Sequence, residues 1–304
     1  MFVSLGMADE RWRLPAVPRL AVEAVAAIVL SSPFAGPFNL GALPGTETWV
    51  LPPLLGIALA GFFTVGTVNA VNMLDGVDGL AGSSAAASLV WLALIAFHGG
   101  DSYLAVHALV LLAAVSGFLL FNLRHPWQGK ASVFLGDGGS LMLGAALAFF
   151  IIRLCHGEGG IAFPILLWIV VVPVADTLSL IVRRLASRRS PLSPDRWHLH
   201  HLLLDAGLSP AVASMLISGA NALCGAVAYA GVVFDIADSV MALALLVPLA
   251  AHSMVVLILR DLHAHEEFVV PSSANTAGAA YLPQAVREKP RCRPRCVTTF
   301  PAMR

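Results

Sequence analysis

The sequence predicts an all-α protein, a polytopic transmembrane helical bundle of about eight spans with its functional loops on the cytoplasmic face. Of its 304 residues, 58% are hydrophobic and only 12% are charged, and the mean hydropathy is +0.82. Apolar segments recur along most of the chain, each close to the roughly 20 residues that cross about 30 Å of hydrocarbon. This composition and pattern exclude an ordinary soluble domain.

The expected spans cover most of the chain in order. They are residues 16–33, 49–72, 83–98, 103–122, 139–155, 161–182, 210–234 and 239–260. Residues 1–262 are therefore expected to form one transmembrane domain. Residues 263–304 are expected to form a disordered cytoplasmic tail, because they are rich in proline and basic residues. No cleavable signal peptide is expected, because acidic residues appear within the first ten positions.

Basic residues orient the bundle, because Lys and Arg accumulate in cytoplasmic loops. All but one of the 18 fall on the side of the loops at residues 9–15, 69–82, 123–138 and 183–203, and Arg153 alone lies near the other side. The net charge of zero therefore hides an asymmetry across the membrane, and no nucleic-acid partner is implied. Cys155, Cys224, Cys292 and Cys296 form no framework of pairs and are expected to be free thiols.

The first polar loop has the sequence NAVNMLDGVDGLAG, from Asn69 to Gly82. Asn69 and Asn72 share a helix face at a spacing of three residues, and Asp75 and Asp78 follow at the same spacing. The intervening glycines permit tight turns and a close approach of a ligand to backbone N–H groups. A nucleotide or metal site fits this loop, and a pair of Asx turns before a helix start is the alternative.

The second loop, VFLGDGGSLMLG, places Asp137 between glycines immediately before a span. Glycines there can expose backbone donors to an anion, and the carboxylate can supply an oxygen ligand to Mg²⁺. A simple helix N-cap by Asp137 or Ser140 explains the pattern equally well.

The third loop, RRLASRRSPLSPDRWHLHHLL, carries Arg196 and the trio His198, His200 and His201. Arginine can bind phosphates in a bidentate manner, and histidine can donate to them. Zinc is disfavoured for this trio, because no further Cys or His ligands lie nearby in sequence. Asp9 and Glu10, before the first span, add a carboxylate pair on the same side. Together these groups are typical of a site that transfers a phosphoryl group from a polyanionic donor to a lipid acceptor.

In these loops the chain resembles the polyprenyl-phosphate N-acetylhexosamine-1-phosphate transferase family. The resemblance lies in NAVNMLDGVDGLAG, in FNLRHPWQGKASVFLGDGGSLMLG and in PVADTLSLIVRRLASRRSPLSPDRWHLHH, and it covers roughly residues 5–205. The form D-R-x-H-x-H-H resembles the branch that uses N-acetylglucosamine for O-antigen lipopolysaccharide, enterobacterial common antigen or teichoic acid linkage. The muramoyl-pentapeptide branch usually has three consecutive histidines, and Leu199 interrupts them here.

The resemblance implies a bacterial inner-membrane enzyme. It would transfer N-acetylglucosamine 1-phosphate from a UDP-sugar to undecaprenyl phosphate, release UMP and begin a cell-envelope polysaccharide, with Mg²⁺, or Mn²⁺ in its place, as cofactor. A homodimer is compatible with it. By motif position, Asn72 and Asp137 would bind the metal. Catalytic roles would fall to Asp9, Glu10, Asp75 and Asp78, and substrate binding to Asn69, Lys130, Arg196, His198, His200 and His201.

Two departures from the family pattern leave alternatives open. Glu10 stands where the second aspartate of an Asp-Asp pair is expected, and the first two helices of the family and most of a third precede the point where this sequence starts. A truncated, catalytically inactive paralogue is therefore one alternative, and the muramoyl-pentapeptide reaction is another. A transporter is disfavoured because the polar residues lie at one face rather than at the midplane, Asp176 excepted.

Overall fold

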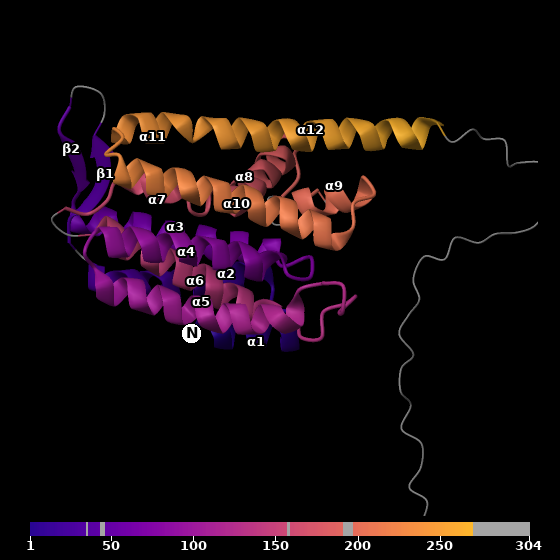
Figure 1. Ribbon diagram of the computed structural model, residues 1–304, viewed down its shortest axis with the longest axis horizontal. Helices are drawn as coiled ribbons and strands as arrows, with labels where there is room; N and C mark the ends of the chain where they lie inside the picture. Colours follow the sequence, from indigo (N-terminus) through magenta and orange to yellow (C-terminus); the bar gives the residue numbers. More distant parts are fainter. Residues whose placement is uncertain (35, 43–45, 157–158, 191–196, 270–304) are drawn as a thin grey trace, which may run out of the picture. The chain divides into compact units, whose positions relative to one another are not determined.

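The computed structural model describes residues 1–34, 36–42, 46–156, 159–190 and 197–269, with side chains as far as Asp261. It confirms the polytopic all-α prediction (Figure 1). In chain order the elements are α1 (Phe2–Trp12), α2 (Ala16–Ser31), η1 (Ser32–Phe34), β1 (Phe38–Ala42), β2 (Thr48–Leu51), α3 (Pro53–Leu74), α4 (Leu80–His98), α5 (Ser102–Asn122), α6 (Gly136–Cys155), α7 (Phe163–Leu167), α8 (Val171–Ala186), α9 (Leu199–Asp205), α10 (Pro210–Val233), α11 (Asp238–Ala244) and α12 (Leu246–Val269).

Seven helical segments in the described part of the chain are long and apolar enough to cross a membrane. They are Ala16–Phe34, Pro53–Leu74, Leu80–His98, Ser102–Asn122, Gly136–Cys155, Pro210–Val233 and Asp238–Asp261. Helices α3, α4 and α6 bury half or more of their residues, whereas α5 buries 28% and exposes apolar side chains instead. Such exposure fits contact with lipid rather than water, so the chain is a multi-pass membrane protein.

The prediction of one continuous helix over residues 161–182 is wrong. The chain forms the short helix α7, breaks at residues 168–170 and resumes as α8. Pro173 explains the break, because it has no N–H to donate to the Ile169 carbonyl and its ring would collide with it. That carbonyl accepts a hydrogen bond from the Ser88 hydroxyl of α4 at 2.9 Å. A neighbouring helix thus satisfies the backbone group that the break releases.

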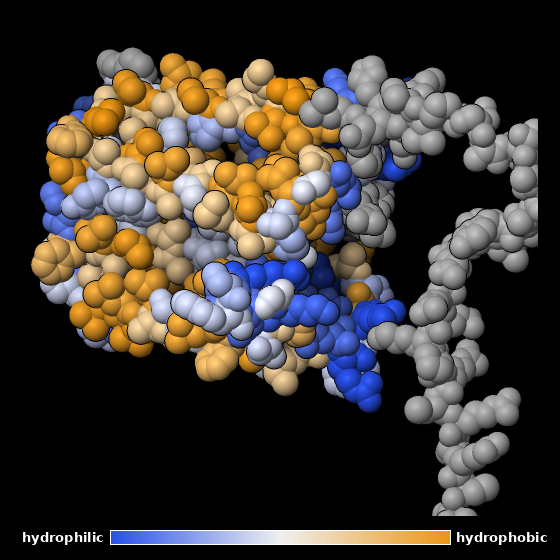
Figure 2. Space-filling model, turned by 45° about the vertical axis from the view of Figure 1, so that its right-hand side comes forward, coloured by the Kyte–Doolittle hydropathy of each residue, from blue (hydrophilic) through white to orange (hydrophobic). Residues whose placement is uncertain are grey.

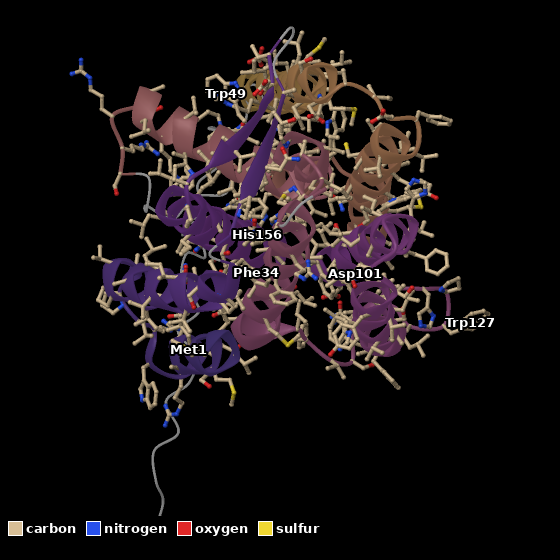
Figure 3. The ribbon with its side chains drawn as sticks, turned by 90° about the vertical axis from the view of Figure 1, so that its left-hand side faces the viewer. Met1, Phe34, Trp49, Asp101, Trp127 and His156 are labelled. Atoms are coloured by element: carbon tan, nitrogen blue, oxygen red, sulfur yellow. The ribbon has the colours of Figure 1, made fainter. Side chains whose placement is uncertain are left out.

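The prediction of a helix from residue 49 is also wrong at its start, because residues 48–51 form a strand. β1 and β2 pair as an antiparallel hairpin, with Phe38 opposite Leu51 and a bulge between Asn39 and Gly41. Figure 3 views this end of the bundle, with Trp49 on the hairpin and His156 beside Phe34. The His156 ring also lies 5.7 Å from the ring of Phe38 in β1, centre to centre. The hairpin therefore covers the end of α6.

The site loops lie at the end of the bundle opposite the hairpin (Figure 1). The end of α1, the α3–α4 and α5–α6 loops, and α9 all reach this end. The last helix, α12, continues to Val269, so the predicted tail from residue 263 begins as helix, and residues 270–304 lie outside the described part. Cys155 and Cys224 are free thiols, as predicted, whereas Cys292 and Cys296 lie outside the described residues.

Candidate active site

Four carboxylates from three separate segments surround one cavity of about 350 Å³ at the loop end of the bundle. Glu10 comes from α1, Asp75 and Asp78 from the α3–α4 loop, and Asp137 from the start of α6. The remaining lining residues are Gly76, Val77, Asn122, Phe134, Leu135 and Gly136. The structure therefore unites side chains that are as many as 127 positions apart in sequence.

The last turn of α3 meets the first turn of α6 through Asn72. Its side-chain amide donates to Asp137 Oδ1 at 2.8 Å and lies 2.9 Å from the Ser140 hydroxyl. Close packing of α3 on α6 allows this, because a Cβ on Gly144 would lie only 2.6 Å from Val68 Cα. The two residues predicted as metal ligands thus lie side by side.

Glu10 joins α1 to the same place. Its Oε1 accepts a hydrogen bond from the backbone N–H of Asp137 at 2.6 Å. The preceding residue, Gly136, has φ 68°, and a Cβ there would lie 2.3 Å from Glu10 Oε1. Glycine at position 136 is therefore required both for the left-handed backbone and for the approach of Glu10.

The negative charges at the cavity act on one another. Burial, together with the nearby carboxylates of Asp137, Asp78 and Glu10, raises the pKa of Asp75 from its ordinary value to about 6. Asp78 has two partners from the α5–α6 loop. Arg124 donates to its Oδ2 at 2.7 Å, and the N–H of Ala131 lies 3.2 Å from the same atom. Asp78 thus anchors the α5–α6 loop to the wall of the cavity.

A second network lies one helix turn deeper. Arg19 donates to Asp9 Oδ2 at 2.7 Å and to the Asn69 side-chain oxygen at 3.1 Å. The Asn69 amide donates to Glu23, which is fully buried in α2, and Arg19 Nε lies 3.3 Å from Glu23 Oε1. The other oxygen of Asp9 accepts from the Leu14 N–H at 2.9 Å. Both oxygens of Asp9 are therefore engaged within the protein.

Arg19 also faces open space. Together with Asp9, Glu10, Arg13 and Asp137 it lines a second cavity of about 420 Å³, completed by Leu14 and Ala16. Glu10 and Asp137 line both cavities. The first cavity is lined by four carboxylates, the second by three carboxylates and two guanidinium groups, and the two share a wall.

Residues 198–201, at the start of α9, carry three histidines and are called the histidine loop below. They pack against the α3–α4 loop, which carries Asp75 and Asp78 and is called the first aspartate loop. His200 is 1% exposed, and a Cβ on Gly76 would lie 2.3 Å from its Nε2. Burial, together with the neighbouring His201 and His198 and against the opposing charge of Asp176, lowers the pKa of His200 from its ordinary value to about 4. His198 places Nδ1 2.8 Å from Asp176 Oδ2, and its ring is stacked on that of His200.

The structure distributes the predicted site residues over several places. The carboxylate cavity unites Glu10, Asp75, Asp78 and Asp137, and Asn72 adjoins it through its hydrogen bond to Asp137. Asn69 and Asp9 belong to the Arg19 network. His200 lies beside Gly76, and the rings of His198 and His201 lie against the His200 ring. Lys130 is exposed in the α5–α6 loop, outside the lining of both cavities, and Arg196 lies outside the described residues.

Sequence reasoning missed Arg19 and Glu23 as members of these networks, and it considered Asp176 only as an argument for a transporter. It also missed His252 of α12, whose Nε2 lies 3.2 Å from Asp176 Oδ1. Glu23 and His252 carried a signal that could have been used. Each is an ionisable residue inside an apolar segment, which is a costly placement unless the group has a partner.

Comparison with known proteins connects these loops with one family. Residues 1–155, which contain both aspartate loops and the Arg19 network, match the family model of glycosyl transferase family 4. The chain belongs to this family. The match ends at the last residue of α6, so α8, α9 and α12 lie beyond it.

Curated bacterial relatives have a common name. An undecaprenyl-phosphate alpha-N-acetylglucosaminyl 1-phosphate transferase of Haemophilus influenzae is 30% identical over 79% of this chain and 68% of its own length. The protein of the same name from Pasteurella multocida is 34% identical over 45% of this chain and 39% of its own length. The Escherichia coli K12 protein is 31% identical over 75% of this chain and 62% of its own length. Relative to the last two, this chain spans less than two thirds of the full length.

Proposed function

We propose that this chain transfers N-acetylglucosamine 1-phosphate from UDP-N-acetylglucosamine to undecaprenyl phosphate and releases UMP. The observation that carries the proposal is the meeting of four carboxylates from three separate segments at one cavity, beside a second cavity with two arginines. The names of the relatives supply the acceptor and the sugar. A polyanionic donor and an anionic acceptor need this combination, because cations must offset their charges while carboxylates hold those cations.

The reaction is a phosphoryl transfer. An oxygen of the undecaprenyl phosphate attacks the β-phosphorus of the UDP-sugar, and the bond from that phosphorus to the bridging oxygen breaks. UMP leaves with that oxygen, and the product is undecaprenyl diphosphate N-acetylglucosamine. Little covalent chemistry is required of the protein, so the work of its side chains is positioning and charge stabilisation. The product would prime a cell-envelope polysaccharide such as O-antigen.

Mg²⁺ is the cofactor that suits the carboxylate cavity, and Asn72 and Asp137 would be its protein ligands. The donor set consists of oxygens, which Mg²⁺ prefers, and the mutual repulsion that raises the pKa of Asp75 is relieved by a divalent cation. Among the described residues no group of three or more His, Cys, Asp and Glu converges on one point. Two protein ligands suffice, because Mg²⁺ usually keeps several waters or substrate oxygens. When bound, the ion would neutralise the diphosphate.

The acceptor phosphate fits the second cavity. Arg13 and Arg19 both line it, beside the carboxylates of Asp9, Glu10 and Asp137. Arg13 is the guanidinium proposed to bind the phosphate oxygens, because Arg19 already contacts Asp9, Asn69 and Glu23. A neighbouring groove of about 670 Å³ on α1 is lined by Met7 and Trp12 with Ser4, Ala8, Glu10 and Arg11. Met7 and Trp12 are 62% and 70% exposed, so this face offers apolar surface to a polyprenyl chain that enters from the bilayer.

The proposed orientation of the bundle in the membrane rests on the distribution of its basic residues. The end with the site loops is rich in hydrophilic residues, and the flank of the bundle is largely hydrophobic (Figure 2). The basic residues of these loops support a cytoplasmic site in a bacterial inner membrane, where UDP-sugars are available. Arg153, the exception, lies 3.3 Å from Asp101 at the hairpin end. A homodimer stays an expectation, which light scattering of the purified protein tests.

The decisive experiment is UMP release by the purified chain in detergent, from UDP-N-acetylglucosamine with undecaprenyl phosphate. We expect release to require the lipid and to stop when a chelator removes divalent cations. Substituting UDP-N-acetylgalactosamine and UDP-N-acetylmuramoyl-pentapeptide tests the sugar and the alternative reaction. A monodisperse sample that releases no UMP from any donor, beside an active relative, would exclude the proposal.

A further inference from the structure

The carboxylate of Asp176 lies behind the histidine loop and accepts hydrogen bonds on both oxygens. His198 donates from Nδ1 to Oδ2 at 2.8 Å, and the Leu199 N–H donates to Oδ1 at 2.9 Å. A second histidine, His252 of α12, places Nε2 3.2 Å from Oδ1. Asp176, His198 and His252 are 3%, 8% and 9% exposed. The three side chains thus form a closed polar cluster that joins α8, the histidine loop and α12.

We propose that His252 is a positioning residue for the transferase site, which acts through Asp176 on the histidine loop. The inference rests on the proposed function. It adds to the site a residue of α12, a helix outside the part of the chain that matches the family model. His252 touches neither cavity, so its effect must pass through Asp176.

The hydrogen bonds to Asp176 determine which ring nitrogen of His198 and of His252 carries a proton. Because a carboxylate only accepts, His198 must carry a proton on Nδ1, which leaves its Nε2 available to a ligand. By the same argument His252 donates from Nε2. A buried carboxylate with donors on both oxygens cannot rotate without losing one of them, and losing a donor in a buried site is costly. His252 therefore fixes the plane of Asp176, and Asp176 fixes the tautomer and orientation of His198.

The orientation of His198 reaches the catalytic cavity in two steps. The rings of His198 and His200 are stacked, with centroids 5.6 Å apart and an interplanar angle of 10°. His200 in turn packs against Gly76, which lines the carboxylate cavity between Asp75 and Asp78. A shift of Asp176 would therefore move the histidines relative to the aspartate loop. Shifts of about 1 Å at such supporting positions can cost on the order of a hundredfold in rate.

A purely structural role for His252 makes a different prediction. If the residue only filled space between α8 and α12, a ring of similar size without a donor would replace it. His252→Phe keeps an aromatic ring, of somewhat larger volume, and removes the hydrogen bond, whereas His252→Gln keeps an amide N–H that can reach Asp176. His107→Phe is the matched control, because His107 is exposed on α5 and contacts Tyr103.

The test is steady-state kinetics of these three variants in detergent, with donor and acceptor varied separately. We expect His252→Phe to raise the KM for the UDP-sugar about tenfold and to leave the KM for the lipid unchanged. Removing the hydrogen-bond partners that orient a ligand-binding histidine typically weakens binding by about this factor. We expect His252→Gln to recover most of this loss and His107→Phe to match the wild type. His252→Ala replaces His252→Phe if the latter is not recovered as monodisperse protein. An unchanged donor KM, or no recovery by Gln, would overturn the proposal.

A second measurement separates this inference from the proposed function. Nuclear magnetic resonance of protein with ¹⁵N-labelled histidine reports the tautomer of His198 without turnover. We expect the Nδ1–H tautomer in the wild type and in His252→Gln, and a mixture of tautomers in His252→Phe. An inactive wild type with this pattern would refute the proposed reaction and leave the positioning role standing. The same His198 signals in all three proteins would refute the positioning role.

Discussion

The side-chain amide of Asn72 lies 2.8 Å from the Asp137 carboxylate, although 65 positions separate the two residues in sequence. Asn72 is in the last turn of α3 and Asp137 in the first turn of α6, so the contact joins the ends of two neighbouring membrane helices. Each residue belongs to a different polar loop. Their pairing places the proposed metal site at the junction of these loops.

Removing the charge of Asp137 tests this junction. We expect Asp137→Asn to reduce Mg²⁺-dependent turnover by on the order of a hundredfold or more, because the variant loses the negative charge that is proposed to bind Mg²⁺ in the cavity. Insertion into the membrane should be normal, because the amide is almost the same size. Glu47→Gln, an exposed carboxylate beside the hairpin, is the control and should have wild-type activity. Normal turnover by Asp137→Asn would remove this residue from the metal site.

Gly76 is expected to tolerate no side chain. A Cβ there would lie 2.3 Å from His200 Nε2, so Gly76→Ala must displace the histidine or the aspartate loop. We expect a loss of about 2 kcal/mol in the free energy of unfolding, typical of overpacking, and a larger loss of activity than of stability. Gly66→Ala in α3 is the matched control, because its Cβ would meet nothing within 4 Å. Equal activity of the two variants would contradict the packing described for His200.

Glu23 is expected to stabilise the Arg19 network. Glu23→Ala leaves the Asn69 amide and part of the Arg19 guanidinium without their partner, and breaking such a buried pair costs about 3 kcal/mol. Glu23→Gln keeps an acceptor for Asn69 and should cost less. Unfolding by denaturant in micelles measures both losses. Equal losses in the two variants would show that the hydrogen bond to Asn69 contributes nothing.

His200 makes the stability depend on pH in a defined direction. Its pKa is about 4 in the folded protein and 6.5 ordinarily, so between these values the unfolded chain binds a proton that the folded chain does not. The free energy of unfolding therefore falls as the pH is lowered through this window, by about 3 kcal/mol in total. His200→Gln should remove this contribution, and His107→Gln should keep it. The same acid sensitivity in both variants would contradict the burial of His200 as a neutral ring.

The sequence predicted the spans and the polar loops because their signals are local. Segment length and hydropathy indicate the helices, and the motifs around Asp75 and Asp137 lie in single short stretches. Pro173 could have predicted the break between α7 and α8, because proline has no backbone N–H. Hydropathy is averaged over a window, however, and is not sensitive to one missing N–H. Residues 49–51 were assigned to a helix because an apolar strand and the start of a span have similar composition.

The networks behind the site needed the fold. Arg19 was assigned to the cytoplasmic side by charge alone, and its contacts with Asp9 and Asn69 depend on how α2 packs on α1 and α3. His252 is 76 positions from Asp176, and no periodicity relates two helices at that separation. Such partners are set by tertiary packing, which a sequence pattern for one helix does not encode.

The most direct test of the central claim follows the β-phosphate of the donor. UDP-N-acetylglucosamine carrying ³²P in the β position is incubated with the chain, undecaprenyl phosphate and Mg²⁺, and the lipid is extracted. The account predicts that the label enters the lipid together with the sugar, while label in the α position stays in the aqueous phase as UMP. Sugar in the lipid with the β label left behind as UDP would contradict it, because the chain would then transfer a sugar without its phosphate.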